Sequence, residues 1–180
     1  VEYKFDLPKE DDLSEILFTT GTTGKSKGIK IVYRNNVAIA QNVSEAIGIT
    51  NDDVEMVTAP MNHSMALRRT YTVFYKGGTV VLTDGVKFIE DFFKLLDMYN
   101  VTGLTFAPAI LEQLLKFAKD RFGTYSDRLR YIQLGSAPLS EKAKETLKEM
   151  FPNTKLFNIY GATESGCTVS LEFSKYGDKK

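Results

Sequence analysis

The sequence is poor in the side chains that form disulfides and bind transition metals. It has one cysteine and one histidine among 180 residues, which excludes an internal disulfide and a cysteine-based metal cluster and is typical of a reducing compartment. Cys167 is therefore interpreted as an ordinary residue without a functional role. His63 has no second histidine or cysteine with which to share a metal ion, so we expect no transition-metal site.

Net charge and long apolar runs are missing as well. The 23 lysines and arginines balance 23 aspartates and glutamates, so the chain has no overall basic field that would attract nucleic acid or an anionic membrane. Any anion binding must be local. No apolar run approaches the roughly 18 residues of a membrane span, and residues 1–15 have no feature of a signal peptide. We expect a cytoplasmic protein without a membrane span or a nucleic-acid partner.

The composition is otherwise that of a globular domain. Hydrophobic residues make up 43% and charged residues 26% of the chain, which excludes a disordered or fibrous protein. The length is sufficient for one domain with a substantial core. The sequence starts at Val1 and reaches its first motif at Thr19, and we expect it to be a piece of a longer polypeptide.

Short apolar runs alternate with helical patterns along the chain. Strands are expected at 16–18, 29–32, 56–59, 79–82, 102–107, 131–134 and 156–159. Five helices are expected. Apolar residues spaced three and four apart predict the first four, at Val37/Ala40/Val43/Ala46/Ile47, at Leu67/Tyr71/Phe74, at Phe88/Phe92/Leu95/Tyr99 and at Leu111/Leu114/Leu115/Ala118. The fifth is expected over 140–151. Gly48 should end the first of these helices, and Pro108 should open the fourth. The alternation predicts an α/β fold with a largely parallel sheet and helices on both faces.

The stretch from Thr19 to Gly28, TTGTTGKSKG, is rich in glycine and hydroxyl side chains. Its glycines allow positive φ and close approach of the backbone, so that successive N–H groups can converge on phosphate oxygens. The predicted phosphate-binding residues are Thr19, Thr20, Gly21, Thr22, Thr23, Gly24, Lys25 and Lys27. The alternative is a plain turn.

The spacing of this stretch excludes a P-loop. That motif needs a glycine five positions before the glycine of its Gly-Lys-Ser/Thr element; here the element is Gly24-Lys25-Ser26, and the required position holds Thr19. The loop instead resembles that of the adenylate-forming superfamily, which includes acyl-CoA and aryl-CoA synthetases, peptide-synthetase adenylation domains and luciferases. The family loop usually reads Thr-Ser-Gly-Thr-Thr-Gly-x-Pro-Lys-Gly. This chain departs from it at Thr20, which keeps the hydroxyl, and at Ser26, which replaces the proline.

A second segment, Asn158 to Glu164, resembles the family motif Tyr-Gly-x-Thr-Glu. An aromatic ring at Tyr160 offers a flat face to adenine, and Gly161 admits a ligand against the backbone. The resemblance implies that Thr163 and Glu164 are catalytic, with the Thr163 hydroxyl on the α-phosphate and the Glu164 carboxylate on Mg²⁺. It also assigns four residues to the nucleotide site: Asn158, Tyr160, Gly161 and Ala162. The alternative is a core tyrosine beside a solvated glutamate.

Two further segments carry the resemblance. Leu134–Leu139 is similar to the family segment whose backbone runs along adenine, here through Gly135, Ser136, Ala137 and Pro138; the alternative is an ordinary strand-to-helix turn. Ala59–His63 is similar to a Pro-x-x-His element at the entrance of the acyl pocket, so that His63 and Gly161 would face the carboxylate substrate; the alternative is a structural histidine. Arg68 and Arg69 are interpreted as the solvated face of a helix and left out of the site; the alternative is contact with an anionic substrate or with the phosphates of CoA.

The three nucleotide segments follow the strands at 16–18, 131–134 and 156–159. Because ligands of parallel sheets bind beyond the carboxyl ends of the strands, we expect the segments to converge on one ligand. The resemblance implies a parent enzyme that activates a carboxylic acid with ATP and Mg²⁺ and passes the acyl group to CoA. Residues 1–180 would form a fragment of its large N-terminal domain, without the segment before the loop and the C-terminal lid domain, and inactive alone. Transfer to a carrier-protein thiol and a non-catalytic nucleotide-binding module remain open.

Overall fold

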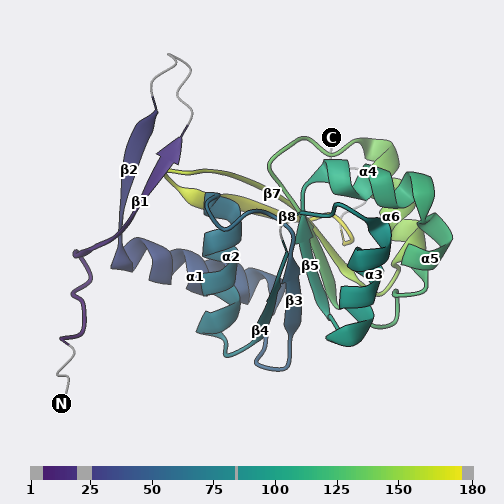
Figure 1. Cartoon of the computed structure of the whole chain (residues 1–180), viewed down its shortest axis with the longest axis horizontal. Coiled ribbons are helices and arrows are strands. Elements are labelled where there is room, and N and C mark those ends of the chain that lie inside the picture. Colours follow the sequence, from purple (N-terminus) through teal and green to yellow (C-terminus); the bar gives the residue numbers. More distant parts are fainter. Residues whose placement is uncertain (1–5, 20–25, 84, 176–180) are drawn as a thin grey trace.

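A six-stranded sheet forms the centre of the molecule (Figure 1). The computed structural model describes residues 6–19, 26–83 and 85–175. The sheet has the order β4-β3-β5-β6-β7-β8, and all neighbours are parallel except β7 and β8. Its strands are β3 (Val54–Val57), β4 (Thr79–Leu82), β5 (Gly103–Phe106), β6 (Tyr131–Leu134), β7 (Lys155–Ala162) and β8 (Gly166–Glu172). The predicted α/β class with a largely parallel sheet is confirmed.

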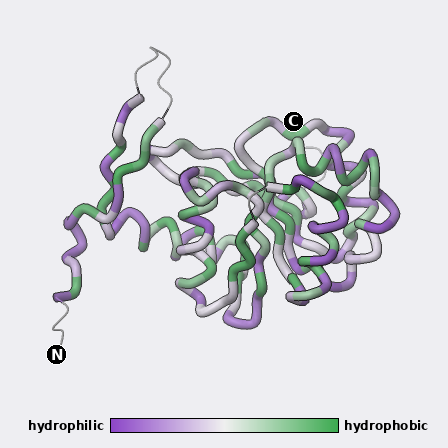
Figure 2. The backbone as a smooth tube through the Cα atoms, in the orientation of Figure 1, coloured by the Kyte–Doolittle hydropathy of each residue, from purple (hydrophilic) through white to green (hydrophobic). Residues whose placement is uncertain are grey.

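Helices cover both faces of this sheet, as predicted (Figure 1). One face carries α1 (Tyr33–Ile47) and α2 (Ser64–Tyr75), and the other carries α3 (Ile89–Met98), α4 (Pro108–Phe117), α5 (Lys119–Gly123) and α6 (Glu141–Met150). A separate apolar core lies on each side. Phe93, Phe106 and Phe122 belong to the larger one, whereas Val43 and Val73 belong to the smaller one under α1 and α2. Figure 2 shows the corresponding hydrophobic colour along the central strands.

Local sequence signals set several helix ends. Gly48 follows α1 in the left-handed conformation, with φ of 79°, and its N–H donates to the Ser44 carbonyl. Pro108 occupies the first turn of α4, and the Ser140 hydroxyl accepts a hydrogen bond from the N–H of Ala143 at 3.2 Å to cap α6. Among the described residues, no helix combines the length and the hydropathy needed to cross a membrane.

The buried faces of α2 and α3 differ from the expectation. Phe74, one of the residues whose spacing predicted α2, is 59% exposed. The buried face of α2 consists of Ala66, Arg68, Arg69, Thr70, Thr72 and Val73. Phe88 and Tyr99 at the ends of α3 are exposed, whereas Phe92, Phe93 and Leu96 are buried. Apolar spacing predicted the wrong buried face for α2. The elements packed against this helix offer hydrogen-bond and ion-pair partners to Arg68 and Arg69, so that these charged side chains are buried.

The strands that flank the Thr-rich loop form a unit of their own. β1 (Leu13–Thr19) and β2 (Lys27–Val32) pair antiparallel in a separate two-stranded sheet. The predicted strand-loop-strand arrangement is therefore confirmed. The expectation that this loop follows a strand of the parallel sheet is wrong, because β1 pairs with its own neighbour in sequence and the hairpin extends away from the central sheet (Figure 1).

β7 is longer than predicted. Its first half, through Asn158, pairs with β6, and its second half continues to Ala162 paired with β8. Tyr160, Gly161 and Ala162 therefore lie in a strand, not in a loop after it. The sequence prediction ended the strand at residue 159 because it contained no β8, whose antiparallel ladder supplies the hydrogen bonds for the second half.

Candidate functional site

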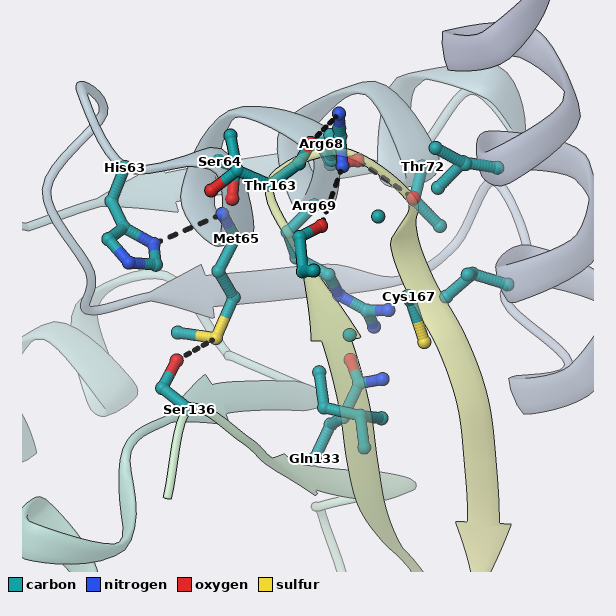
Figure 3. Close-up of a pocket in the computed structure, with 16 residues that line it drawn as sticks. His63, Ser64, Met65, Arg68, Arg69, Thr72, Gln133, Ser136, Thr163 and Cys167 are labelled. Carbon is teal, nitrogen blue, oxygen red and sulfur yellow. Dashed lines mark hydrogen bonds between the residues drawn. The ribbon is translucent and has the colours of Figure 1, made fainter. Parts of the chain in front are cut away.

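A cavity of about 280 Å³ lies between α1, α2 and the ends of β6, β7 and β8 (Figure 3). Its lining residues come from segments far apart in the chain: Ile39, Val43, His63, Ser64, Met65, Arg68, Arg69, Thr72, Gln133, Ser136, Ile159, Gly161, Ala162, Thr163, Gly166 and Cys167. The lining thus combines apolar side chains with two arginines, and it contains no carboxylate. The position beyond β6 is the edge of a parallel sheet at which ligands bind.

The cavity brings together part of the predicted site. Five predicted residues line it: His63, Ser136, Gly161, Ala162 and Thr163. Eight others do not: Thr19, Lys27, Gly135, Ala137, Pro138, Asn158, Tyr160 and Glu164. Tyr160 is 74% exposed and Glu164 is exposed beyond the end of β7. The remaining predicted residues, Thr20, Gly21, Thr22, Thr23, Gly24 and Lys25, lie outside the described residues.

Two of the phosphate-loop residues sit at the end of the hairpin. Thr19 and Lys27 are register partners in β1 and β2, and the Thr19 carbonyl accepts a hydrogen bond from the Ser26 hydroxyl at 3.1 Å. Lys27 is exposed. The described chain therefore holds the two ends of the loop side by side, with a lysine at one of them.

His63 caps the N-terminus of α2. Its Nδ1 accepts a hydrogen bond from the N–H of Met65 at 3.2 Å (Figure 3). A neutral imidazole that accepts at one nitrogen carries its proton on the other, so this bond assigns the proton to Nε2. His63 thereby has a structural role as a cap and retains a donor for a ligand.

The backbone beside β6 and β7 is tightly packed. Ser136 has positive φ (72°), and its hydroxyl lies 3.2 Å from the Met65 sulfur. A side chain at Gly135 would overlap Ile159, and one at Gly161 would overlap the carbonyl of Gly166. These glycines allow β6, β7 and β8 to approach one another at the cavity.

The sequence interpretation of Arg68 and Arg69 as a solvated face is wrong. Both are buried, with 5% and 4% of their surfaces exposed. Arg68 donates from Nη2 to the Thr163 carbonyl at 2.7 Å and from Nη1 to the Ala162 carbonyl at 3.4 Å. It thereby ties α2 to the turn that carries Thr163 and Glu164. Burial lowers the pKa of the Arg68 guanidinium, and the charges of Glu15 and Glu164 act in the opposite direction.

Arg69 forms a buried ion pair with Glu55 of β3. Its Nε and Nη2 both bind the carboxylate, the second at 2.6 Å to Oε2. Thr105 and Tyr131 each donate a hydroxyl hydrogen bond to Glu55 at 2.7 Å, so both carboxylate oxygens are satisfied. Burial lowers the pKa of Arg69, but the interactions with Glu55 outweigh it and raise that pKa overall. Burial also raises the pKa of Tyr131, with Glu55 adding to the effect, so the phenol remains a donor.

A signal for this pair was present in the sequence. Glu55 stands inside the apolar run Val54–Val57, and a carboxylate within a buried strand requires a partner of opposite charge. Arg69 fits that requirement, yet periodicity alone placed it on the outside of its helix.

Cys167 lines the cavity beside these groups. Burial raises the pKa of its thiol, and the charge of Arg69 opposes this shift. A raised thiol pKa favours the neutral, unreactive form. Within the described residues no group of three histidine, cysteine, aspartate or glutamate side chains could hold a metal ion. Glu164 is thus a single exposed carboxylate, the type of oxygen ligand that Mg²⁺ prefers.

Comparison with known proteins identifies the family. The family model described as AMP-binding enzyme matches residues 2–180. The chain belongs to the AMP-binding enzyme family. Within this family it is 30% identical over 179 residues to 4-coumarate--CoA ligase-like 3 of Arabidopsis thaliana, a match that covers 96% of the chain and 32% of the relative. The chain thus spans about a third of that relative's length.

Solved structures share the fold of this chain. The o-succinylbenzoate CoA synthetase of Bacillus subtilis, solved with a CoA product analogue, is 26% identical, with a TM-score of 0.78 over 91% of this chain and 33% of that chain. CmiS6 is 24% identical and matches the fold with a TM-score of 0.82 over 94% of this chain and 40% of that chain.

Proposed function

We propose that the full-length protein containing this chain activates a carboxylic acid with ATP and transfers the acyl group to CoA. A carboxylate oxygen attacks the α-phosphorus of ATP, the bond from that phosphorus to the bridging oxygen breaks, and pyrophosphate leaves. The thiol sulfur then attacks the acyl carbon of the adenylate, the carbon–oxygen bond breaks, and AMP and a proton are released. Residues 1–180 would be a fragment of the large N-terminal domain of this enzyme.

One observation carries the proposal. His63, Ser136 and Gly161–Thr163 come from three separate segments and line the same cavity at the edge of the parallel sheet. The resemblance to adenylate-forming enzymes assigns these segments to one reaction centre, and CoA ligases are among the relatives. A P-loop enzyme would not need the His63 and Tyr160–Glu164 segments at one site.

We assign the cavity to the acid side of that centre and its border with the nucleotide. His63 and Gly161, which are assigned to the carboxylate, line it together with Ser136 and Ala162 of the nucleotide set, whereas Gly135, Pro138 and Tyr160, which are assigned to adenine, lie outside its lining. The remaining assignments follow the resemblance. The β- and γ-phosphates would be held by Thr19, Thr20, Gly21, Thr22, Thr23, Gly24, Lys25 and Lys27, and the nucleoside by Gly135, Ser136, Ala137, Pro138, Asn158, Tyr160, Gly161 and Ala162.

Charge stabilisation is the main contribution expected of these residues. Negative charge builds on the phosphates during attack, and donors that are already in place lower that barrier. Thr163 would donate its hydroxyl to the α-phosphate, and the Arg68 tether would hold its backbone in place. Mg²⁺, held by Glu164 with the phosphates, would supply further positive charge.

Replacing the proposed metal ligand tests this function. Glu164→Gln keeps the size of the side chain and removes the charge that Mg²⁺ requires, so we expect a loss of carboxylate-dependent pyrophosphate exchange by about 10²-fold or more in the full-length protein. The fold should be unchanged because Glu164 is exposed. Glu149→Gln, at an exposed position on α6, is the matched control. Exchange by Glu164→Gln at the rate of the unaltered protein would refute the metal role.

Two other outcomes would redirect the proposal. Acyl-adenylate formation without CoA-dependent release, together with acylation of a phosphopantetheinyl carrier protein, would identify a carrier-protein thiol as the acceptor. ATP binding without exchange for any carboxylic acid would identify a non-catalytic nucleotide-binding module.

A further inference from the structure

Helix α2 contacts two segments that are far apart in the chain and that are both proposed to bind phosphates. Arg68 donates from Nη2 to the Thr163 carbonyl in the turn after β7, at 2.7 Å (Figure 3). The Tyr71 hydroxyl donates to Oε2 of Glu15 in β1, at 3.0 Å. Residues three apart in a helix are neighbours on its surface. Burial lowers the pKa of Arg68, and the charges of Glu15 on the hairpin and of Glu164 on the turn both oppose this shift.

The Tyr71 bond reaches the face of the hairpin that carries the ends of the predicted phosphate loop. Glu15, Leu17 and Thr19 lie on one face of β1, because successive side chains of a strand point to opposite faces. This face is half-buried or buried, whereas Phe18 on the opposite face is 73% exposed. Lys27 is the register partner of Thr19 and shares its face. The bond therefore holds the side of the hairpin from which the loop ends would reach phosphate.

Few other hydrogen bonds join the hairpin to the helices. Asn36 of α1 donates from Nδ2 to the Ser14 hydroxyl at 3.2 Å, but α1 directly follows β2. Within the described ranges, Tyr71 makes the one hydrogen bond from the two strands to an element that is not their neighbour in sequence. Burial raises the pKa of the Tyr71 phenol to about 12, with Glu15 adding to the effect, so the hydroxyl remains a donor at neutral pH.

We propose that Arg68 and Tyr71 position the nucleotide by holding the hairpin and the turn after β7 at a fixed separation. In the proposed function, on which this inference rests, the hairpin carries Thr19 and Lys27 for the β- and γ-phosphates, and the turn carries Thr163–Glu164 for the α-phosphate and Mg²⁺. The phosphates of one nucleotide are joined covalently, so both segments bind them together only when their separation is correct. Arg68 and Tyr71 act through the backbone of these segments and are positioning residues.

Tyr71→Phe in the full-length protein tests the contact with the hairpin. The substitution keeps the ring and removes the donor to Glu15, so we expect the Kd of Mg·ATP in calorimetry and its KM in pyrophosphate exchange to rise by at least about fivefold. The KM of the acid, selected from a panel of straight-chain, benzoic and cinnamic acids, should stay within about twofold, because Tyr71 lies outside the cavity lining. Tyr125→Phe is the matched control, since it removes an equivalent bond to Asp97, of 3.1 Å, on the other face of the sheet.

A double-mutant cycle tests the contact with the turn. Arg68→Met removes both bonds to backbone carbonyls, so kcat for exchange should fall by about tenfold alone but by less than about threefold when Glu164→Gln is already present. The two changes act through one turn, and their effects should not multiply. A purely structural Arg68 would lower kcat equally in both backgrounds. Arg68→Lys keeps the charge and should recover part of the loss; if Arg68→Met does not fold, Arg68→Lys replaces it in the cycle.

The outcomes separate this inference from the function on which it rests. An unchanged Kd of Mg·ATP in folded Tyr71→Phe, an equal rise in Tyr125→Phe, or equal losses in both backgrounds of the cycle would overturn the inference and leave the function standing. Exchange with no acid by the unaltered protein would overturn the proposed function, and the calorimetric Kd in Tyr71→Phe would then decide the inference alone. No binding of Mg·ATP to the unaltered protein would overturn both.

Discussion

At the scale of single residues, Asp53 shows how a buried carboxylate joins segments that are distant in sequence. It is fully buried directly before β3. Its Oδ2 accepts the N–H of Thr50 at 2.8 Å, and its Oδ1 accepts the Thr102 hydroxyl at 2.8 Å. Arg130, directly before β6, forms an ion pair with it. Burial raises the pKa of Asp53, but the hydrogen bonds from Arg130, Thr50 and Thr102 together outweigh burial and hold it below its usual value.

The lowered pKa gives a prediction for stability. A carboxyl whose folded pKa is depressed stabilises the fold above its unfolded pKa, about 4, and loses this contribution as the pH falls through the folded pKa. Asp53→Asn should lower the free energy of unfolding at pH 7 by about 1–3 kcal/mol, and the difference should narrow below about pH 4. Urea unfolding across this pH range measures both. Asp52→Asn, at the exposed neighbouring position, is the control; equal effects of the two substitutions would contradict the prediction.

At the scale of elements, the contact between β7 and β8 depends on the absence of a side chain. A Cβ at Gly161 would overlap the Gly166 carbonyl and lie 3.1 Å from the Cα of Cys167. These are backbone atoms, which cannot move aside as a flexible side chain can. The strands must therefore separate if residue 161 gains a methyl group, and the cavity lies at this point.

We expect Gly161→Ala to lower the free energy of unfolding by about 1–3 kcal/mol and to reduce acyl-adenylate formation in the full-length protein. Urea unfolding and pyrophosphate exchange provide the two measurements. Gly123→Ala is the control, because a Cβ there would meet only the Met150 Cε, at an ordinary 3.7 Å. A Gly161→Ala protein as stable and as active as the control would show that β8 adjusts without cost.

At the scale of the whole molecule, the sequence predicted the architecture well because alternation of strands and helices is a local property. The segments at 79–82 and 131–134 were assigned with the observed bounds. The features that the sequence did not predict depend on contacts between different elements. β8 is exposed or half-buried at all but its first residue and is a strand because β7 lies beside it. The inward face of α2 is set by Glu55, which is 14 residues away from Arg69.

The residues of the candidate site divide in the same way, into those that a local motif predicted and those that contacts with other elements determine. His63, Ser136 and Gly161–Thr163 were found from motifs, since each belongs to a contiguous pattern, and all line the cavity. Arg68 and Arg69 were missed because their partners are a backbone carbonyl pair and a carboxylate on other elements. A charged residue was read as solvated because its sequence neighbours did not reveal those partners.

The isolated chain should be a weak binder without turnover. Residues 1–180 correspond to about a third of a curated relative. The resemblance to adenylate-forming enzymes implies an aspartate that holds the ribose hydroxyls and a lysine of the C-terminal domain that stabilises the adenylation transition state, and we expect both outside residues 1–180. Positioning and charge supply most of the rate, so we expect weak ATP affinity and no pyrophosphate exchange from this chain alone. Calorimetry with ATP and exchange assays beside the full-length protein measure this. Robust carboxylate-dependent exchange by residues 1–180 would contradict it.

The two halves of β7 differ in how firmly their backbone is held. Phe157 and Asn158 have partners in both β6 and β8, whereas within the described chain Ile159–Ala162 pair with β8 alone. A segment paired with one strand opens more readily than a segment paired with two, even with the Arg68 bonds to the carbonyls at its end, so we expect its amide hydrogens to exchange with solvent faster than those of the first half. Thr163 and Glu164 follow that segment directly. The residues proposed to contact nucleotide thus follow the part of β7 that is paired with β8 alone, and occupancy by ligand should slow its exchange.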